Sequence, residues 1–249
     1  MNRMQQHALW WLALAVALVV LGMAGCDSRL ISKDEEVKLG QQAGDDFEHQ
    51  YGRETDPRLN ALVASIAKNL ERVTEPPDYP YDYRVLADDT VNAAAFPGGR
   101  IYVFRGLINK VNSNPDEVAW VLAHETTHVS RQHAIRRIEK QLGYETIIAL
   151  VLGQSDAGKI ASVVGGLVLL DYGRDNEYEA DRMGMLYSYK AGYDPTASVA
   201  VLELFQKLQK NEPSKLEIMF ATHPGNNDRI NHSKDYLTNM GWSGAYYSP

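Results

Sequence analysis

Cysteine is almost absent from this sequence, since Cys26 is the only one in 249 residues. A single cysteine cannot form a disulfide within the chain, which excludes the disulfide-stapled folds. A thiol nucleophile is excluded as well, because Cys26 follows an apolar run near the N-terminus and lies far from every candidate catalytic residue. Disulfide scaffolds and cysteine-dependent enzymes are therefore ruled out.

Positive charge is also scarce. The chain carries 25 lysine and arginine residues against 32 aspartate and glutamate residues, which gives a net charge of −7. No basic stripe is present to neutralise phosphates, so nucleic acid is not an expected partner. Apolar residues make up 45% of the chain and charged residues 23%, as in ordinary folded proteins. The length suits one domain, with or without a small appendage.

The sequence has no apolar run of the roughly 20 residues that a membrane-spanning helix needs. An uninterrupted run over residues 8–21 follows a short positive start and is typical of a signal-peptide core. The segment Leu-Gly-Met-Ala-Gly-Cys at 21–26 resembles a bacterial lipobox, with Met23 where leucine is commonest. We therefore predict a signal peptide over residues 1–25 and a lipid on Cys26. The alternatives are a plain signal peptide with an incidental cysteine, or an uncleaved anchor.

The predicted lipid implies a location. It would anchor the chain to a membrane of a bacterial cell envelope, facing the periplasm. Asp27 directly after the cysteine resembles the inner-membrane retention signal of enteric bacteria, which slightly favours the inner over the outer membrane. Residues 27–249 are predicted to form a single domain, because they contain no repeat, charge block or low-complexity linker.

Most of this domain is predicted to be helical, with one small sheet, in an α+β architecture. Capping residues, first-turn prolines and apolar spacing indicate helices over 32–50, 56–73, 115–141, 194–210 and 224–240. Short β-type runs indicate strands at 83–87, 91–96 and 100–104, with a Pro-Gly-Gly turn between the last two. The apolar stretches 147–152 and 160–170 are interpreted as a buried helical hairpin. A cover over a cleft or a patch resting on a membrane is the alternative.

The residues His124-Glu125-Thr-Thr-His128 lie inside one of these helices. Two histidines at this spacing lie one turn apart on the same face, with Cβ atoms roughly 5–6 Å apart. Both rings can then reach one zinc ion at about 2.0–2.1 Å. Glu125 is displaced around the helix and can take a proton from a water molecule that a metal activates. The alternative is a pair of ordinary core or surface histidines.

A catalytic zinc needs a third protein ligand and an open fourth position. A third histidine ten residues after the first is excluded, because that position is Ala134 and the accompanying glycine position is Arg131. His133 is one residue out of register, and we expect it to face solvent or a neighbouring carboxylate. Cysteine ligands are excluded by their absence. A carboxylate from the segment Asn-Glu-Tyr-Glu-Ala-Asp at 176–181 remains.

With these motifs, residues 32–240 resemble the CAAX-prenyl-protease and HtpX-like zinc metallopeptidases, the forty-eighth metallopeptidase family. The likeness is strongest to its soluble bacterial periplasmic lipoproteins and mitochondrial Oma-type proteases. It implies a zincin-type (gluzincin) domain with a small sheet beside the cleft and one Zn²⁺ per chain. The resemblance makes Glu177 the third ligand and places Asp181 behind a ligand histidine, with Glu179 as the rival ligand. Thr126 and Thr127 depart from the apolar or small residues usual in relatives.

Two further segments match the family. Residues 92–103 resemble the segment that leads into the edge strand beside the cleft, which implies substrate contacts at Asn92, Ala94 and Phe96. An ordinary hairpin is the alternative reading. Thr-His-Pro at 222–224 and the arginine that follows resemble the family's His-Pro element.

By that likeness, His223 and Arg229 stabilise a developing oxyanion or orient the substrate. In some periplasmic relatives the matching histidine occupies the fourth zinc position and holds the enzyme idle. A capping or packing role for His223, and an exposed Arg229 without function, are the alternatives.

The resemblance implies a zinc metalloendopeptidase acting on extended or damaged proteins of a bacterial periplasm. Prenylated peptides are not expected substrates, because the chain lacks the several long apolar segments of a membrane-spanning chamber. The alternative is a membrane-tethered chaperone or assembly factor for outer-membrane proteins, with structural zinc or marginal hydrolysis.

Overall fold

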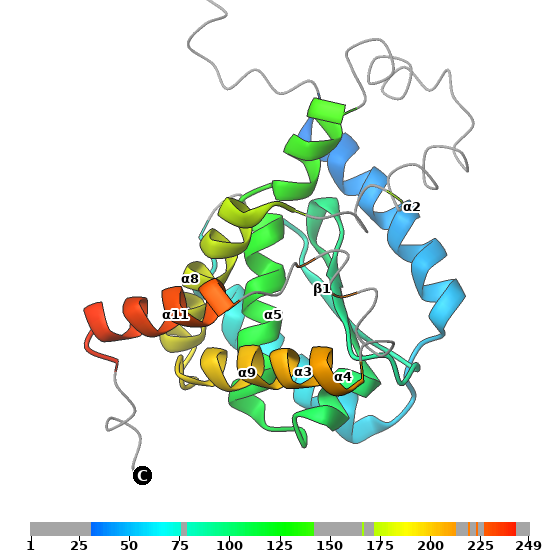
Figure 1. Cartoon of the computed structure of the whole chain (residues 1–249). Helices are drawn as coiled ribbons and strands as arrows, with labels where there is room; N and C mark the ends of the chain where they lie inside the picture. The colour runs from blue at the N-terminus through cyan, green and yellow to red at the C-terminus, as the bar shows by residue number, and fades with distance from the viewer. Residues whose placement is uncertain are drawn as a thin grey trace, which may run out of the picture.

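The computed structural model of the chain describes residues 31–75, 79–141, 166, 172–212, 219, 223 and 227–242. The predicted signal peptide and lipobox lie outside these residues, and so do the apolar stretches 147–152 and 160–170 apart from Gly166. Among the described residues, helices predominate and pack around a three-stranded sheet (Figure 1). The predicted α+β architecture is confirmed. No helix of this described part is long and apolar enough to cross a membrane.

The strands are β1 (Asp82–Leu86), β2 (Ala93–Ala95) and β3 (Arg100–Phe104). Strand β3 is central, with β1 parallel to it on one side and β2 antiparallel on the other. Strand β2 is therefore an edge strand. The predicted strand 100–104 is confirmed, β1 begins one residue earlier than predicted, and β2 is shorter than the predicted 91–96.

The α-helices of the described part of the chain include α2 (Lys33–Tyr51), α3 (Pro57–Glu71), α4 (Arg105–Lys110), α5 (Pro115–Ser130), α8 (Arg174–Lys190), α9 (Ala197–Asn211) and α11 (Asn227–Asn239). Helix α2 begins with the predicted capping box between Ser32 and Glu35. Helix α9 begins later than predicted, because Asp194 forms a turn in which its Oδ1 accepts a hydrogen bond from the Thr196 amide at 2.8 Å. Helix α4 has no counterpart among the predicted helices.

The prediction of one continuous helix over 115–141 is wrong. Helix α5 ends at Ser130, and Gln132 then adopts a left-handed conformation with φ of 59° before helical structure resumes at 133–141. The side-chain amide of Gln132 donates a hydrogen bond from Nε2 to the hydroxyl of Tyr79 at 2.7 Å. This break is what lets the residues after it turn back toward α5.

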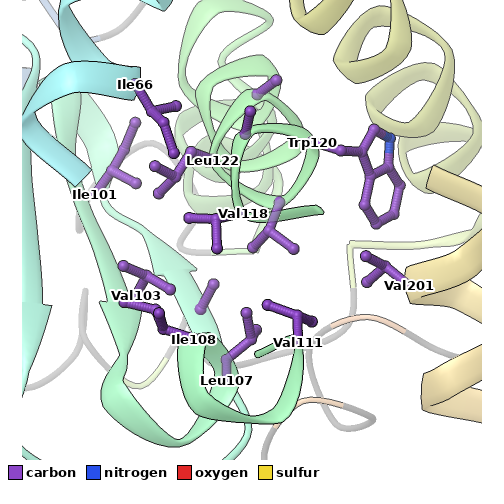
Figure 2. Close-up of a cluster of buried hydrophobic side chains, with 14 of the residues drawn as sticks. Ile66, Ile101, Val103, Leu107, Ile108, Val111, Val118, Trp120, Leu122 and Val201 are labelled. Carbon is purple, nitrogen blue, oxygen red and sulfur yellow. The ribbon is translucent and has the colours of Figure 1, made fainter. Parts of the chain in front are cut away.

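The sheet is covered on both faces. Side chains along β3 alternate: Tyr102 and Phe104 pack against α2, whereas Ile101 and Val103 pack in the cluster with α3 and α5. Figure 2 shows part of this second cluster, which contains Ile66, Leu107, Val118, Trp120, Leu122 and Val201.

Helix α5 is buried on every side from Val118 to Ser130. Its two threonines are buried without cost, because each hydroxyl donates to the carbonyl four residues earlier. The helix with the His-Glu-x-x-His motif is therefore a rigid central element, which suits precise positioning of side chains.

Candidate metal centre

Two neighbouring helices bring the candidate ligands together. His124 and His128 project from α5, and Glu177 projects from the first turn of α8. The helices approach closely at Gly184, where an added Cβ would lie 3.1 Å from the backbone nitrogen of His124. A larger residue there would push α8, and Glu177 with it, away from the histidines.

Four buried side chains form one compact group of potential ligands: His124, His128, Glu177 and His223. Their ligand atoms all lie within 4.8 Å of one another. The Nε2 atoms of His124 and His128 are 3.1 Å apart, and they lie 3.6 Å and 3.4 Å from the Glu177 carboxylate. The His223 Nδ1 atom lies 3.0 Å from Glu177 and 3.4 Å from the His124 Nε2.

These separations fit a tetrahedral metal site. Four ligand atoms at about 2.0–2.1 Å from a zinc ion are about 3.3 Å from one another. The measured separations lie around that value, and the donor set of imidazole nitrogens and one carboxylate is the kind that zinc prefers. Glu177 is in this group and Glu179 is not. The residues present therefore fit zinc.

One side of the group is held by a buried ion-pair network. The Nδ1 atom of His124 lies 3.0 Å from Oδ1 of Asp181. Arg229 donates to both oxygens of Asp181, from Nε at 2.8 Å and from Nη2 at 2.5 Å, and its Nη1 lies 2.7 Å from Glu177. Arg229 is only 4% exposed, so the reading of an exposed arginine without function does not fit its position. Its guanidinium fixes the two carboxylates in place.

The other side is held through His128. The Nδ1 atom of His133 lies 2.9 Å from Nδ1 of His128, and the Nε2 atom of His133 lies 3.3 Å from Glu179. Arg131 lies against the second oxygen of Glu179 at 3.3 Å. His133 is buried and faces a carboxylate rather than solvent. His133, which its spacing excluded as a ligand, thus contacts the candidate ligand His128.

Glu125 is buried next to the group, with its Oε1 atom 3.5 Å from Nε2 of His223. Among the described residues, its other oxygen, Oε2, has no hydrogen-bond partner. Burial raises the pKa of the Glu125 carboxyl, and the His223 and His124 imidazoles oppose the rise. A buried carboxylate with one unused oxygen is well suited to exchange a proton with a reactant.

The charges of the group favour metal binding. Burial alone would raise the pKa of Glu177, but His223 and Arg229 outweigh it and hold that pKa well below its usual range. Burial lowers the pKa of His128, which keeps the ring neutral. An ionised carboxylate and a neutral imidazole are the protonation states in which these groups bind metals.

The register of β2 directs the main chain of the three predicted substrate residues toward β3. The amide of Phe96 donates to the carbonyl of Arg100, and the amide of Phe104 donates to the carbonyl of Asn92. In an antiparallel pair, alternate residues share this orientation, so the main chain of Ala94 also faces β3. Asn92, Ala94 and Phe96 are all buried.

The main chain of Ala93 and Ala95 consequently points to the outer edge of β2, called the free edge below because no other described strand pairs with it. Tyr172 already uses this edge, because its hydroxyl donates to the Ala95 carbonyl at 3.4 Å. The Tyr172 ring also stacks on His128, with centroids 3.9 Å apart. Sequence reasoning missed all three residues. Strand alternation distinguishes Ala93 and Ala95 from Ala94, but which of them face the outer edge depends on the pairing with β3, which the sequence does not show. Nothing in the sequence marks Tyr172.

Comparisons with known proteins agree with this geometry. The profile of peptidase family M48 matches residues 53–236 of the chain. The mitochondrial metalloendopeptidase OMA1 of Schizosaccharomyces pombe is 27% identical over 212 residues, which cover 83% of this chain and 62% of that protein. OMA1 of Arabidopsis thaliana is 33% identical over 189 residues, which cover 76% of this chain and 36% of the relative.

A bacterial relative is the putative beta-barrel assembly-enhancing protease of Vibrio cholerae, 30% identical over 194 residues. That match covers 72% of this chain and 39% of the relative. The matched region thus spans between 36% and 62% of the length of these three relatives. Because the family profile covers most of the sequence, the chain belongs to peptidase family M48, a family of metallopeptidases.

Proposed function

We propose that the chain is a zinc-dependent metalloendopeptidase that hydrolyses internal peptide bonds of proteins. The observation that carries this proposal is the tetrahedral spacing of the ligand atoms of His124, His128, Glu177 and His223, with Glu125 beside them. A site that only bound a structural metal would have no chemical need for the Glu125 carboxylate. Family membership supports the same conclusion.

In the proposed mechanism, His124, His128 and Glu177 hold one zinc ion per chain. Zinc supplies a Lewis acid that makes water nucleophilic near neutral pH and polarises a carbonyl. Glu125 takes the proton of the attacking water and delivers it to the leaving amine. Asp181 and Arg229 keep His124 and Glu177 in position through the contacts described above.

We assign His223 two roles. Its Nδ1 atom lies at the fourth corner of the ligand group, where a resting enzyme would be blocked. A catalytic zinc ion would need one position open for water or substrate, so we propose that His223 would hold the enzyme idle while its Nδ1 stays in the group. Its Nε2 atom lies 3.5 Å from Glu125. Nε2 therefore lies beside the proton-transfer residue, where an imidazole N–H can donate to a developing oxyanion.

The proposed substrates are extended or misfolded proteins of a bacterial envelope. The free edge formed by Ala93 and Ala95 supports extended substrates, because a peptide can add to it through main-chain hydrogen bonds. The envelope setting is supported by the signal-peptide and lipobox pattern and by bacterial relatives named for beta-barrel assembly. A lipid on Cys26 would anchor the chain, and Asp27 favours the inner membrane. Cys26→Ser should then release the protein from the membrane fraction on cell fractionation.

A second candidate function is a membrane-tethered assembly factor or chaperone with marginal proteolysis. Relatives named beta-barrel assembly-enhancing proteases favour it. Such a protein would keep binding unfolded clients when Glu125 is replaced by glutamine. The protease would lose its function in the same variant.

The test measures zinc content and casein hydrolysis by the full chain, Glu125→Gln, Glu177→Gln and the matched control Glu179→Gln. Glu179 lies two residues from Glu177 on α8 but outside the ligand group. We expect one zinc per chain and activity in the wild type, zinc without activity in Glu125→Gln, and reduced zinc in Glu177→Gln only. If the wild type and His223→Ala both bind zinc but cleave nothing, the result would favour the assembly factor. A chain that binds no zinc would refute the assignment of the metal ligands and that of Glu125 as the base.

A further inference from the structure

An apolar pocket adjoins the metal centre. Polar residues of the site, among them His124 and Glu125, line part of it. Trp120 and Leu107, which also line it, are labelled in Figure 2. The large apolar side chains that line it are Leu107, Trp120, Val121, Leu202, Phe205 and Met219. They come from α4, α5 and α9, except for Met219, which lies four residues before His223 in the chain. Among the described residues, the other polar lining residues are two uncharged glutamines, Gln206 and Gln209, and His223 and Arg229 of the site.

We infer that this pocket binds the side chain of the substrate residue that follows the scissile bond, and that it selects large apolar residues there. The inference rests on the proposed peptidase function and adds the class of residue that the site selects.

The direction of proton transfer decides which substrate residue enters the pocket. Glu125 must reach the nitrogen of the scissile bond, because that nitrogen leaves as an amine and needs a proton. The nitrogen belongs to the residue that follows the bond, so the Cα and side chain of that residue lie nearest to Glu125. Glu125 lines the pocket. The side chain beside the new amino terminus is therefore the one that the pocket can receive.

The edge strand supports the same occupant independently. Ala93 contributes to the pocket lining and also to the free main-chain edge of β2. An extended peptide paired with that edge would pass the mouth of the pocket. Because side chains of an extended segment alternate between its two faces, one of them is directed toward the pocket while its neighbours point away.

The lining determines the chemistry of the occupant. Leucine, methionine and phenylalanine gain from burial against Trp120, Leu202 and Phe205. A carboxylate would lose its hydration there, because the Arg229 guanidinium is already paired with Asp181 and Glu177. Alanine would leave most of the space unfilled. Loss of several methylene groups in such a pocket lowers kcat/KM by about tenfold or more.

The test compares three peptides that differ only at the residue after the cleaved bond, which is leucine, alanine or aspartate. The full zinc-loaded chain in detergent is assayed, and cleavage positions are mapped by mass spectrometry. We expect kcat/KM for the leucine peptide to exceed that for the alanine peptide by about tenfold or more, and the aspartate peptide to be the poorest.

Two variants alter the pocket without touching the metal or Glu125. Leu202→Phe narrows the pocket and should reduce the leucine-to-alanine ratio of kcat/KM to about threefold or less. Phe205→Ala widens it and should move the preference toward tryptophan. Leu204→Ala is the matched control, because Leu204 is half-buried on the same helix as Phe205 but does not line the pocket. Its ratio should equal that of the wild type.

The inference and the proposed function fail differently. Hydrolysis with a leucine-to-alanine ratio near one, or a ratio that neither pocket variant changes, overturns the inference and leaves the peptidase intact. If neither the wild type nor His223→Ala cleaves a peptide, the peptidase proposal fails. Fluorescence anisotropy of the labelled leucine and alanine peptides on zinc-loaded Glu125→Gln then decides the inference, and equal affinities overturn it.

Discussion

The Nδ1 atoms of His128 and His133 lie 2.9 Å apart, on the side of the His128 ring that faces away from the ligand group. Chemistry determines the direction of this hydrogen bond. If Nε2 of His128 binds the proposed metal, its Nδ1 carries the proton and donates to His133. The Nε2 of His133 then carries a proton that it can donate to Glu179, 3.3 Å away. His133 is thus a positioning residue for His128.

Removal of this acceptor should weaken zinc binding. His133→Ala leaves the His128 Nδ1–H without a partner, and loss of such a partner typically costs 10–100-fold in metal affinity, about the change that we expect. His133→Gln should retain part of the affinity, because an amide oxygen can accept the same bond. Competition with a chromophoric zinc chelator measures both. His232→Ala, an exposed histidine packed on Tyr178, is the control. An affinity of His133→Ala equal to the wild type would contradict this role.

The fold class, the starts of α2, α3 and α5 and the strand 100–104 could be predicted from local patterns, because capping residues and apolar spacing act within a few positions. The break at Gln132 could not, since a contact with distant Tyr79 holds it. The same limit applies to the site. Spacing brings His124 and His128 together, but the burial of Arg229 between two carboxylates depends on how α11 packs against α8.

A close contact between α2 and the turn before β3 should be sensitive to one methyl group. A Cβ at Gly40 would clash with the carbonyl oxygen of Pro97, which is part of the backbone and cannot move aside alone. At Gly44, one turn later, the nearest atom is the flexible Arg100 Cγ at 2.9 Å. Both changes gain helix propensity equally. We expect Gly40→Ala to lower the free energy of unfolding by about 2–3 kcal/mol and Gly44→Ala to change it by less than about 1 kcal/mol. Urea unfolding of both variants measures this, and similar values would contradict the prediction.

The Tyr172 hydroxyl should compete with substrate for the edge strand. It donates to the Ala95 carbonyl, which an extended peptide would need. Burial, together with Glu125 and Glu177, raises the pKa of Tyr172, so the phenol remains a donor. Tyr172→Phe keeps the ring on His128 but frees the carbonyl. A weak hydrogen bond is worth about 0.5–1.5 kcal/mol, so KM for an extended peptide should fall about threefold with kcat unchanged.

Steady-state kinetics on the leucine peptide decides this prediction. The exposed Tyr189→Phe is the control, because that tyrosine lies on α8 with 44% of its surface exposed. A KM that rises in Tyr172→Phe would mean that the hydroxyl helps to bind substrate.

Arg229 should matter more to folding without zinc than to folding with it. Its guanidinium lies between Asp181 and Glu177, and all three groups are buried. Arg229→Met removes the guanidinium from both buried carboxylates and leaves Glu177 with the His223 imidazole, which should cost about 3–5 kcal/mol of unfolding free energy in the presence of EDTA. Saturating zinc supplies positive charge to Glu177, so the cost should be smaller in the zinc-loaded protein. The unfolding free energy of Arg229→Lys should lie between those of the wild type and Arg229→Met, because an ammonium cannot bind Asp181 with two parallel hydrogen bonds.

The double variant Arg229→Met, Asp181→Leu separates lost charge compensation from lost packing. If unpaired charge is the cause, removal of Asp181 should restore part of the stability that Arg229→Met loses in EDTA, since replacing both partners of a buried pair by apolar residues is often neutral. If packing is the cause, the two losses should add. Arg182→Met, which changes an exposed arginine next to Asp181 in the chain, is the control and should stay within about 0.5 kcal/mol of the wild type. An Arg229→Met variant as stable as this control in EDTA would show that the carboxylates need no cation to fold.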